Sequence, residues 1–225
     1  MPRHRTLLIA LLLPLATLVG GPPATATTTT TTTATTTAAG LLAALPVAAE
    51  AGSTTYARSH FGGWVDADGD SCDTREEVLL AESTVAPRVG SGCAVLSGAW
   101  PSWYDGATWT SPGDVDIDHV VALKEAWESG ARSWPAAERR GFANDLGFAW
   151  SLDAVTDNVN ASKGDRDPAA WMPPLRSVHC AYATHWVAVK HRWRLSVDAA
   201  ERSVLAAVLT GSCGAQEVAV PPRAR

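Results

Sequence analysis

The segment 114–121 carries acidic residues at alternate positions and includes an Asp–His pair. Asp114, Asp116 and Asp118 alternate with branched apolar residues, and His119 directly follows Asp118. Alternation with a period of two is typical of a β-strand, so the three carboxylates should share one face. At the end of such a strand a carboxylate can hold a divalent cation, while the neighbouring imidazole accepts a proton from water. The competing interpretation is an edge strand with a solvated acidic face.

A second polar segment follows after a loop and could complete such a site. Residues 152–155 have the pattern of a short strand, and Asp157 can cap the helical turn that follows. Asn160 and Lys163 are three residues apart and should share one face of that turn, which Gly164 can end. The order strand, loop, strand and short helix predicts a compact unit in which both segments meet.

This layout is that of a ββα-metal nuclease site, and the chain resembles the HNH endonuclease superfamily, most closely its secreted bacterial branch. The resemblance covers nearly the whole of residues 41–213 and rests on four matching stretches. They are FGGW…CDTREEVLL at 61–80, DIDHVVALKEAW at 116–127, RRGFANDL at 139–146 and NASKGDRDPAAW at 160–171. The fold that it implies is α+β, with the ββα-metal (HNH) motif embedded in a mostly helical domain.

The resemblance implies roles for the matching residues. His119 is expected to be the general base that activates water, and Asp118 and Asn160 are expected to bind one divalent cation. Oxygen ligands suit a hard cation, so Mg²⁺ is expected, with Mn²⁺ or Ca²⁺ as alternatives. The cation would turn the repulsion between carboxylates and an anionic substrate into binding. Lys163 is expected to neutralise a neighbouring phosphate oxygen.

Two further roles stay open in the sequence. The middle Asn of the superfamily, which fastens a loop of the site, corresponds to either Asn144 or Asn158. Arg75 lies in a matching stretch distant from the central motif and is expected to reach the site and contact phosphate. The alternative for Arg75 is a surface ion pair with Glu76 or Glu77.

The chain contains four cysteines, Cys72, Cys93, Cys180 and Cys213. An even number in an exported protein indicates two disulfide bonds, and the sequence has none of the close CxxC pairs typical of a zinc site. Apolar spacing predicts a helix over 179–193, and a capping-box pattern predicts a second helix from Asp198 to Gly211. Helices joined by a short turn lie antiparallel, which brings the last two cysteines together at the C-terminal hairpin. The predicted pairs are therefore Cys72–Cys93 and Cys180–Cys213.

The N-terminal residues predict export. A basic start, a short apolar run and a small-residue cleavage site are typical of a signal peptide over residues 1–26. A membrane-spanning helix is the alternative, but the run is shorter than the roughly 20 residues required and contains Pro14. The remaining predicted parts are a solvated Thr/Ala-rich linker at 27–40, the nuclease domain at 41–214 and a disordered tail at 215–225.

Composition limits the function further. The chain has 225 residues, 46% of them hydrophobic, and a net charge of −5. This hydrophobic content predicts a folded core, whereas the negative charge argues against a protein that coats nucleic acid with a basic surface. The basic cluster from Lys190 to Arg194 could touch a nucleic acid or form the solvated side of its helix. Trp127, Trp186 and Trp193 lie on apolar helical faces and are expected in the core.

Together these expectations describe a secreted, extracellular, metal-dependent endonuclease, acting on DNA in preference to RNA. It is expected to be monomeric and, after signal cleavage, free of the membrane. Two other functions stay open: a secreted binding protein that keeps the scaffold without catalysis, and a phosphodiesterase for RNA or another phosphate ester. The joint presence of Asp118, His119, Asn160 and Lys163 favours catalysis.

Overall fold

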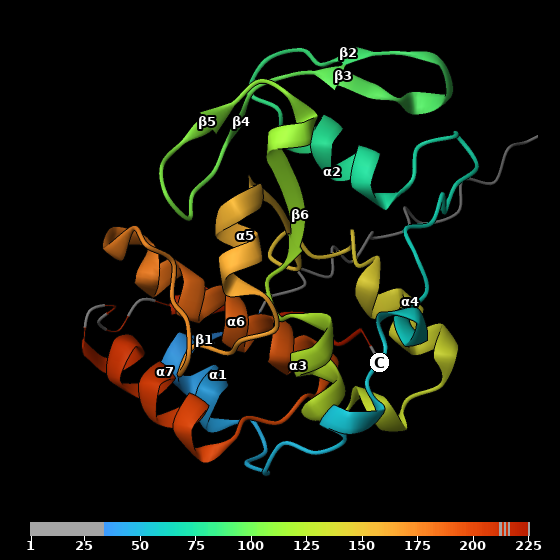
Figure 1. Cartoon of the computed structure of the whole chain (residues 1–225). Coiled ribbons are helices and arrows are strands. Elements are labelled where there is room, and N and C mark those ends of the chain that lie inside the picture. Colours follow the sequence, from blue (N-terminus) through green and yellow to red (C-terminus); the bar gives the residue numbers. More distant parts are fainter. Residues whose placement is uncertain (1–33, 212, 214, 216, 225) are drawn as a thin grey trace, which may run out of the picture. The chain divides into compact units, whose positions relative to one another are not determined.

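Figure 1 shows the computed structural model of the chain. It describes residues 34–211, 213, 215 and 217–224. The predicted signal peptide, 1–26, and the first part of the predicted linker, 27–33, lie outside the described residues. In the part of the chain that the structure describes, no helix has the length and apolar character needed to cross a membrane.

Three helices form the centre of the main core. α6 (His179–Trp193) and α7 (Ala199–Gly211) form the predicted C-terminal hairpin, and α1 (Ala38–Ala43) packs against both (Figure 1). Apolar side chains of α6 fill the interface because they recur at helical spacing, as the sequence indicated. The three tryptophans expected in the core, Trp127, Trp186 and Trp193, are buried.

Both predicted disulfide bonds are present, Cys72–Cys93 and Cys180–Cys213. The predicted cap of α7 is also formed. Oδ1 of Asp198 accepts a hydrogen bond from the backbone N–H of Glu201 at 2.9 Å, and a carboxylate oxygen of Glu201 accepts one from the N–H of Asp198 at 3.2 Å. This reciprocal pair satisfies N–H groups that have no partner inside the helix.

The structure differs from the prediction at both ends of the domain. β1 (Thr35–Thr37) lies in the predicted linker, 27–40, and pairs antiparallel with β8 (Glu217–Ala219), which lies in the predicted tail, 215–225. Threonine favours strands because its branched side chain suits an extended backbone. Neither segment is apolar enough to fold by itself, but each satisfies the backbone hydrogen bonds of the other.

The remaining elements are short and surround the predicted site. Further helices are α2 (Thr74–Glu82), α3 (Leu123–Glu128), α4 (Ala136–Ala143) and α5 (Asp157–Lys163). The other strand pairs are β2 (Arg88–Val89) with β3 (Val95–Ser97), β4 (Trp100–Pro101) with β5 (Thr108–Trp109), and β6 (Val115–His119) with β7 (Leu152–Thr156). The 3₁₀ turns are Ser53–Thr55, Arg58–Phe61, Ser91–Cys93, Pro112–Asp114, Ala131–Ser133 and Arg176–Val178.

The alternating segment 114–121 forms a strand that is shorter than its pattern. The two apolar residues of β6 pack against α2 in a second apolar cluster, as the period of two predicted. Asp114 belongs to the 3₁₀ turn before β6, so only Asp116 and Asp118 are strand residues. Asp118 is buried, which contradicts the interpretation of a solvated acidic edge.

The basic cluster on α6 is largely buried, which neither interpretation of it anticipated. Lys190 is fully buried, and its ammonium contacts carboxylates of Glu125 at 2.6 Å and Glu201 at 2.7 Å. Arg192 is also buried and forms an ion pair with Asp145 at 2.7 Å. The partners come from α3, α7 and the residues after α4, so the sequence of α6 alone could not reveal them.

Candidate active site

The two polar segments meet in one unit formed by β6, β7 and α5. β6 and β7 pair antiparallel, with Asp118 opposite Asp153 and His119 opposite Leu152. α5 follows β7 without a loop and packs against both strands (Figure 1). Gly164 ends α5 with a φ of 56°, a conformation that glycine adopts without strain. This frame brings the end of β6 beside the last turn of α5.

The ring of His119 makes one hydrogen bond and lies flat against an indole. Its Nε2 lies 2.9 Å from the carbonyl oxygen of Ala143, and its ring stacks on Trp64 with centroids 5.1 Å apart. A carbonyl oxygen only accepts, so Nε2 carries the proton, and Nδ1 of the neutral ring can accept one. Burial lowers the pKa of His119 to about 3; the hydrogen bond to Ala143 opposes this shift, and the charges of Arg58 and Lys163 add to it. The imidazole is therefore neutral at any pH near neutrality.

The carbonyl that holds the imidazole belongs to a segment fastened by Asn144. Nδ2 of Asn144 donates to the carbonyl oxygens of Gly63 at 3.2 Å and Arg140 at 2.9 Å, and Oδ1 accepts from the N–H of Val65 at 3.1 Å. These are the loop-fastening contacts expected of one of the two candidate asparagines. Asn158 is exposed, and its side chain makes no hydrogen bond to the described residues.

Asp118 and Lys163 form a buried ion pair. The Lys163 ammonium donates to both carboxylate oxygens at 2.6 and 2.7 Å and to the backbone oxygen of His119 at 2.7 Å. The hydroxyl of Tyr104 donates to Oδ2 of Asp118 at 2.6 Å. Burial raises the pKa of Asp118 and lowers that of Lys163, and the attraction between the two charges opposes both shifts. Lys163 is 0% exposed, so the structure gives it a positioning role in place of the expected phosphate contact.

Asp116 and Asn160 lie next to each other at the open side of this unit. Nδ2 of Asn160 donates to Oδ2 of Asp116 at 3.3 Å, and both residues are partly exposed. The sequence placed Asp116 on the same strand face as Asp118 but gave it no separate role. The structure shows that Asp116 is the more accessible of the two strand carboxylates.

Arg75 reaches the same pocket from α2. One guanidinium nitrogen donates to the carbonyl oxygens of Pro112 at 2.8 Å and Val115 at 3.0 Å, which holds the start of β6. Among the described residues it makes no ion pair with Glu76 or Glu77, the alternative raised by the sequence. The remaining guanidinium nitrogens can serve an anion in the pocket.

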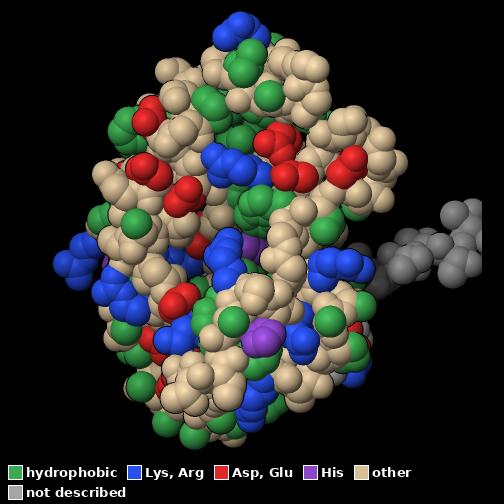
Figure 2. Space-filling view, turned by 45° about the vertical axis from the view of Figure 1, so that its right-hand side comes forward, with side chains coloured by type: hydrophobic (Ala, Val, Ile, Leu, Met, Phe, Trp, Pro, Cys, Tyr) green, Lys and Arg blue, Asp and Glu red, His purple; other side chains and the backbone are tan. Residues whose placement is uncertain are grey.

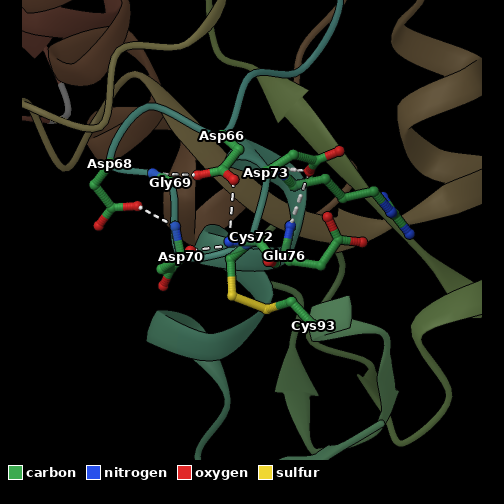
Figure 3. The surroundings of a disulfide bond; sticks show 10 residues. Asp66, Asp68, Gly69, Asp70, Cys72, Asp73, Glu76 and Cys93 are labelled. Carbon is green, nitrogen blue, oxygen red and sulfur yellow. Dashed lines mark hydrogen bonds between the residues drawn. A yellow bond between two sulfur atoms is a disulfide. The ribbon is translucent and has the colours of Figure 1, made fainter. Parts of the chain in front are cut away.

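The start of α2 is fixed by the Cys72–Cys93 disulfide bond and by an acid-rich turn (Figure 3). Asp73 caps the helix by accepting a hydrogen bond from the N–H of Arg75 at 2.8 Å. In the exposed turn before it, Asp66 accepts hydrogen bonds from the N–H groups of Gly69 at 2.8 Å and Ser71 at 3.0 Å. These contacts restrain the helix that carries the guanidinium.

The pocket that these residues line has a volume of about 310 Å³. Its polar lining consists of Arg58, Arg75, Asp116, Asp118, His119, Asn160 and Asp165, with Trp64 beside them. The sequence did not single out Arg58, Trp64 or Tyr104. Trp64 lies in a matching stretch and Arg58 just before it, so position along the chain was an available signal for both. Tyr104 had none, because only the fold brings it to Asp118.

The pocket offers oxygen donors for a divalent cation. Asp116 and Asn160 are partly exposed there, and Asp118 also lines it. Oδ1 of Asp118 accepts one hydrogen bond, from Lys163, which leaves one acceptor position on that oxygen. Two carboxylates and an amide suit a hard cation such as Mg²⁺. The residues present therefore fit the expected cation, with Asp116 added to the expected ligands.

A neutral imidazole beside oxygen donors and a guanidinium, in an open pocket, has the composition of a hydrolase site. Residues 76–208 match the family described as GmrSD restriction endonucleases, C-terminal domain. Because this match covers more than half of the chain, the chain belongs to that family. No solved structure matches the chain.

A relative among curated proteins agrees with the expected export. It is 48% identical over 169 residues, which is 75% of this chain and 81% of the relative. It is described as an uncharacterized secreted protein of Arthroderma benhamiae, a fungal source, whereas the sequence resembled a bacterial branch. The secreted relative and the two disulfide bonds are consistent with the predicted extracellular location.

Proposed function

We propose that the protein is an extracellular, metal-dependent endonuclease that hydrolyses phosphodiester bonds of DNA. Membership of a restriction endonuclease domain family supports nuclease chemistry. The observation that carries the proposal is the state of His119, whose Nε2 is held by a carbonyl oxygen in a pocket that also presents Asp116, Asn160 and Arg75. The β6–β7–α5 unit would then be the ββα-metal motif of HNH enzymes.

In this proposal His119 is the general base. Its Nδ1 accepts a proton from the water that attacks phosphorus, and the resulting imidazolium keeps its hydrogen bond from Nε2 to the carbonyl of Ala143. Trp64 restricts rotation of the ring by stacking on it. Asn144 keeps the carbonyl in place through three hydrogen bonds of its own. These contacts matter because a general base acts only on a proton that lies within hydrogen-bond reach.

The cation would be held by Asp118, Asn160 and Asp116. When bound, it would polarise the phosphate and stabilise the charge on the leaving oxygen. Lys163 and Tyr104 fix the carboxylate of Asp118, so its remaining acceptor position has one orientation. This preorganisation is what a sparse set of ligands needs.

Arg75 and Arg58 would contact substrate phosphate. The chain carries a net charge of −5, so attraction of a polyanion requires a local excess of basic groups. Figure 2 shows Lys and Arg side chains gathered near the middle of the face in view, beside a group of Asp and Glu side chains. Both arginines line the pocket itself, and their planar donors match phosphate oxygens.

Cleavage of plasmid DNA by the purified mature protein in Mg²⁺ tests the proposal. We expect cleavage that a chelator abolishes, and a loss of roughly 10²–10⁴-fold in His119→Ala. The matched control is His60→Ala, which removes an exposed imidazole outside the pocket lining and should cleave at the wild-type rate. Calorimetric titration should show that His119→Ala still binds the cation, whereas Asp118→Asn and Asn160→Ala bind it more weakly.

The same assay distinguishes the other functions. Cleavage of RNA but not DNA would replace the proposed substrate and keep the chemistry. Binding of nucleic acid without cleavage by the wild-type protein would favour a non-catalytic scaffold. If His119→Ala cleaves DNA at the wild-type rate, the proposed HNH mechanism is wrong.

A further inference from the structure

A second group of acidic side chains lies around α3, and none of its members lines the pocket of His119. Glu125 and Glu128 lie on α3, and the backbone N–H of Ala51 donates to the carbonyl oxygen of Glu128 at 3.2 Å. This hydrogen bond brings Glu50 beside the helix. Carboxylate oxygens of Glu50, Glu125 and Glu128 all lie within 4.8 Å of one another.

Two more acids approach the same point from other segments. Glu50 also belongs to a group with Asp167 and Asp198 in which the carboxylate oxygens lie within 4.8 Å of one another. Asp198 is placed there because the chain before α7 is hydrogen-bonded to the end of α3, from the N–H of Ser196 to the carbonyl oxygen of Ser129 at 3.0 Å. The five acids line one pocket of about 370 Å³.

Glu128 is the member that points to a missing partner. It is 8% exposed, and its carboxylate makes no hydrogen bond or ion pair with any described residue. Its oxygens are not among the buried polar atoms that lack a partner, so they are accessible from the pocket that Glu128 lines and are free to bind a cation there. Carboxylate oxygens of Glu50 and Glu125 lie within 4.8 Å of one of its oxygens, and the basic side chains of Lys124 and Arg166 line the same pocket.

The remaining members have spare oxygens. Oδ1 of Asp167 accepts from the N–H groups of two residues at 3.0 Å, and Oδ1 of Asp198 accepts the cap hydrogen bonds of α7. Oδ2 of both makes no hydrogen bond to the described residues. Glu125 is the only one of the five with an ion pair in the described structure, and its partner Lys190 is shared with Glu201.

We propose that Glu50, Glu125, Glu128, Asp167 and Asp198 form a calcium site that joins four separate segments of the chain. Calcium takes six to eight oxygen ligands at about 2.3–2.6 Å, so ligand oxygens lie up to about 5 Å apart. Within each of the two groups of three that share Glu50, the carboxylate oxygens lie within that limit. Magnesium fits less well, because it requires near-ideal octahedral geometry and keeps several waters.

The charge balance agrees with this geometry. A divalent cation would remove the repulsion between Glu50, Glu125 and Glu128 directly. Calcium sites of extracellular modules have dissociation constants of about 10⁻⁴–10⁻³ M, which suits an exported protein.

Calcium titration of the mature full-length protein in saturating Mg²⁺ tests the proposal by calorimetry and thermal unfolding. Wild-type protein should bind one calcium ion, and calcium at about 100 times its dissociation constant should raise the folding equilibrium constant about 100-fold. Glu128→Gln and Glu50→Gln should each bind calcium at least tenfold more weakly. Without calcium both variants should be at least as stable as wild type, because each removes repulsion; Glu50 is exposed, so that variant folds even if a buried substitution does not.

Two controls locate the site. Asp68→Asn removes a carboxylate from the exposed cluster of Asp66, Asp68 and Asp70, and it should bind calcium as wild type does. Asp114→Asn removes an exposed carboxylate from the turn before β6 and should also keep calcium binding. The proposal fails if wild-type protein shows neither heat of binding nor thermal shift, if all variants respond alike, or if Asp68→Asn alone loses the response.

Discussion

Lys163→Met should destabilise the protein strongly, because Lys163 is the partner of a buried carboxylate. Its ammonium makes three hydrogen bonds of 2.6–2.7 Å, two of them to Asp118, and the side chain is 0% exposed. Removing one partner of a buried ion pair typically costs about 3–5 kcal/mol of unfolding free energy. For a domain of this size that corresponds to a fall in Tm of roughly 6–20 °C, at about 2–4 °C for each kcal/mol.

Urea unfolding and differential scanning calorimetry measure this effect. Lys124→Met is the matched control: Lys124 is partly exposed and has no ion pair in the described structure, so its loss should change stability by less than about 0.5 kcal/mol. Adding Asp118→Asn to Lys163→Met should recover part of the loss, because the unpaired charge is then gone. If Lys163→Met has the same Tm as the Lys124→Met control, Lys163 is not buried as described. The phosphate contact suggested by the sequence then becomes the better account.

Three further outcomes follow from the structure. Asn144→Ala removes three hydrogen bonds and should lower the free energy of unfolding, measured in urea, by about 1–3 kcal/mol. It should also lower kcat in plasmid cleavage. An unchanged kcat would show that the carbonyl of Ala143 is held by other contacts. Burial raises the pKa of Glu82 from 4.5 to about 7, so the folded state binds this proton more tightly than the unfolded state. Stability should therefore fall as pH rises from 4.5 to 7, by up to about 3 kcal/mol, and Glu82→Gln, which keeps an acceptor for the N–H of Ala154, should flatten that part of the curve. Arg75→Ala should raise KM for DNA in cleavage assays, and its effect should exceed that of Arg88→Ala, an exposed arginine outside the pocket.

The sequence by itself was sufficient wherever the determining contacts are local. The hairpin of α6 and α7 and the two disulfide bonds follow from helical spacing, a capping box and four cysteines. The β6–β7–α5 order follows from a period of two, a second short strand and a capped turn. Such signals extend over a few residues, so they can be recognised in the sequence without knowledge of the fold.

The ends of the domain show where local signals failed. Composition predicted that residues 27–40 and 215–225 are unstructured, but β1 and β8 pair with Thr36 opposite Val218. A strand of three residues carries little signal in its own sequence, because its hydrogen bonds are supplied by the partner. The partner is identified only when both segments lie on the same core.

Tertiary structure alone decided what each charged side chain does. Lys163 and Lys190 look like surface cations in the sequence, yet each is fully buried against carboxylates that lie between 11 and 65 residues away. The same holds for Glu128, whose burial without a partner depends on the chain around Glu50 folding over α3. A local pattern determines which face of an element a residue occupies, but the fold determines which charge stands opposite, and with it the pKa and the ion pair.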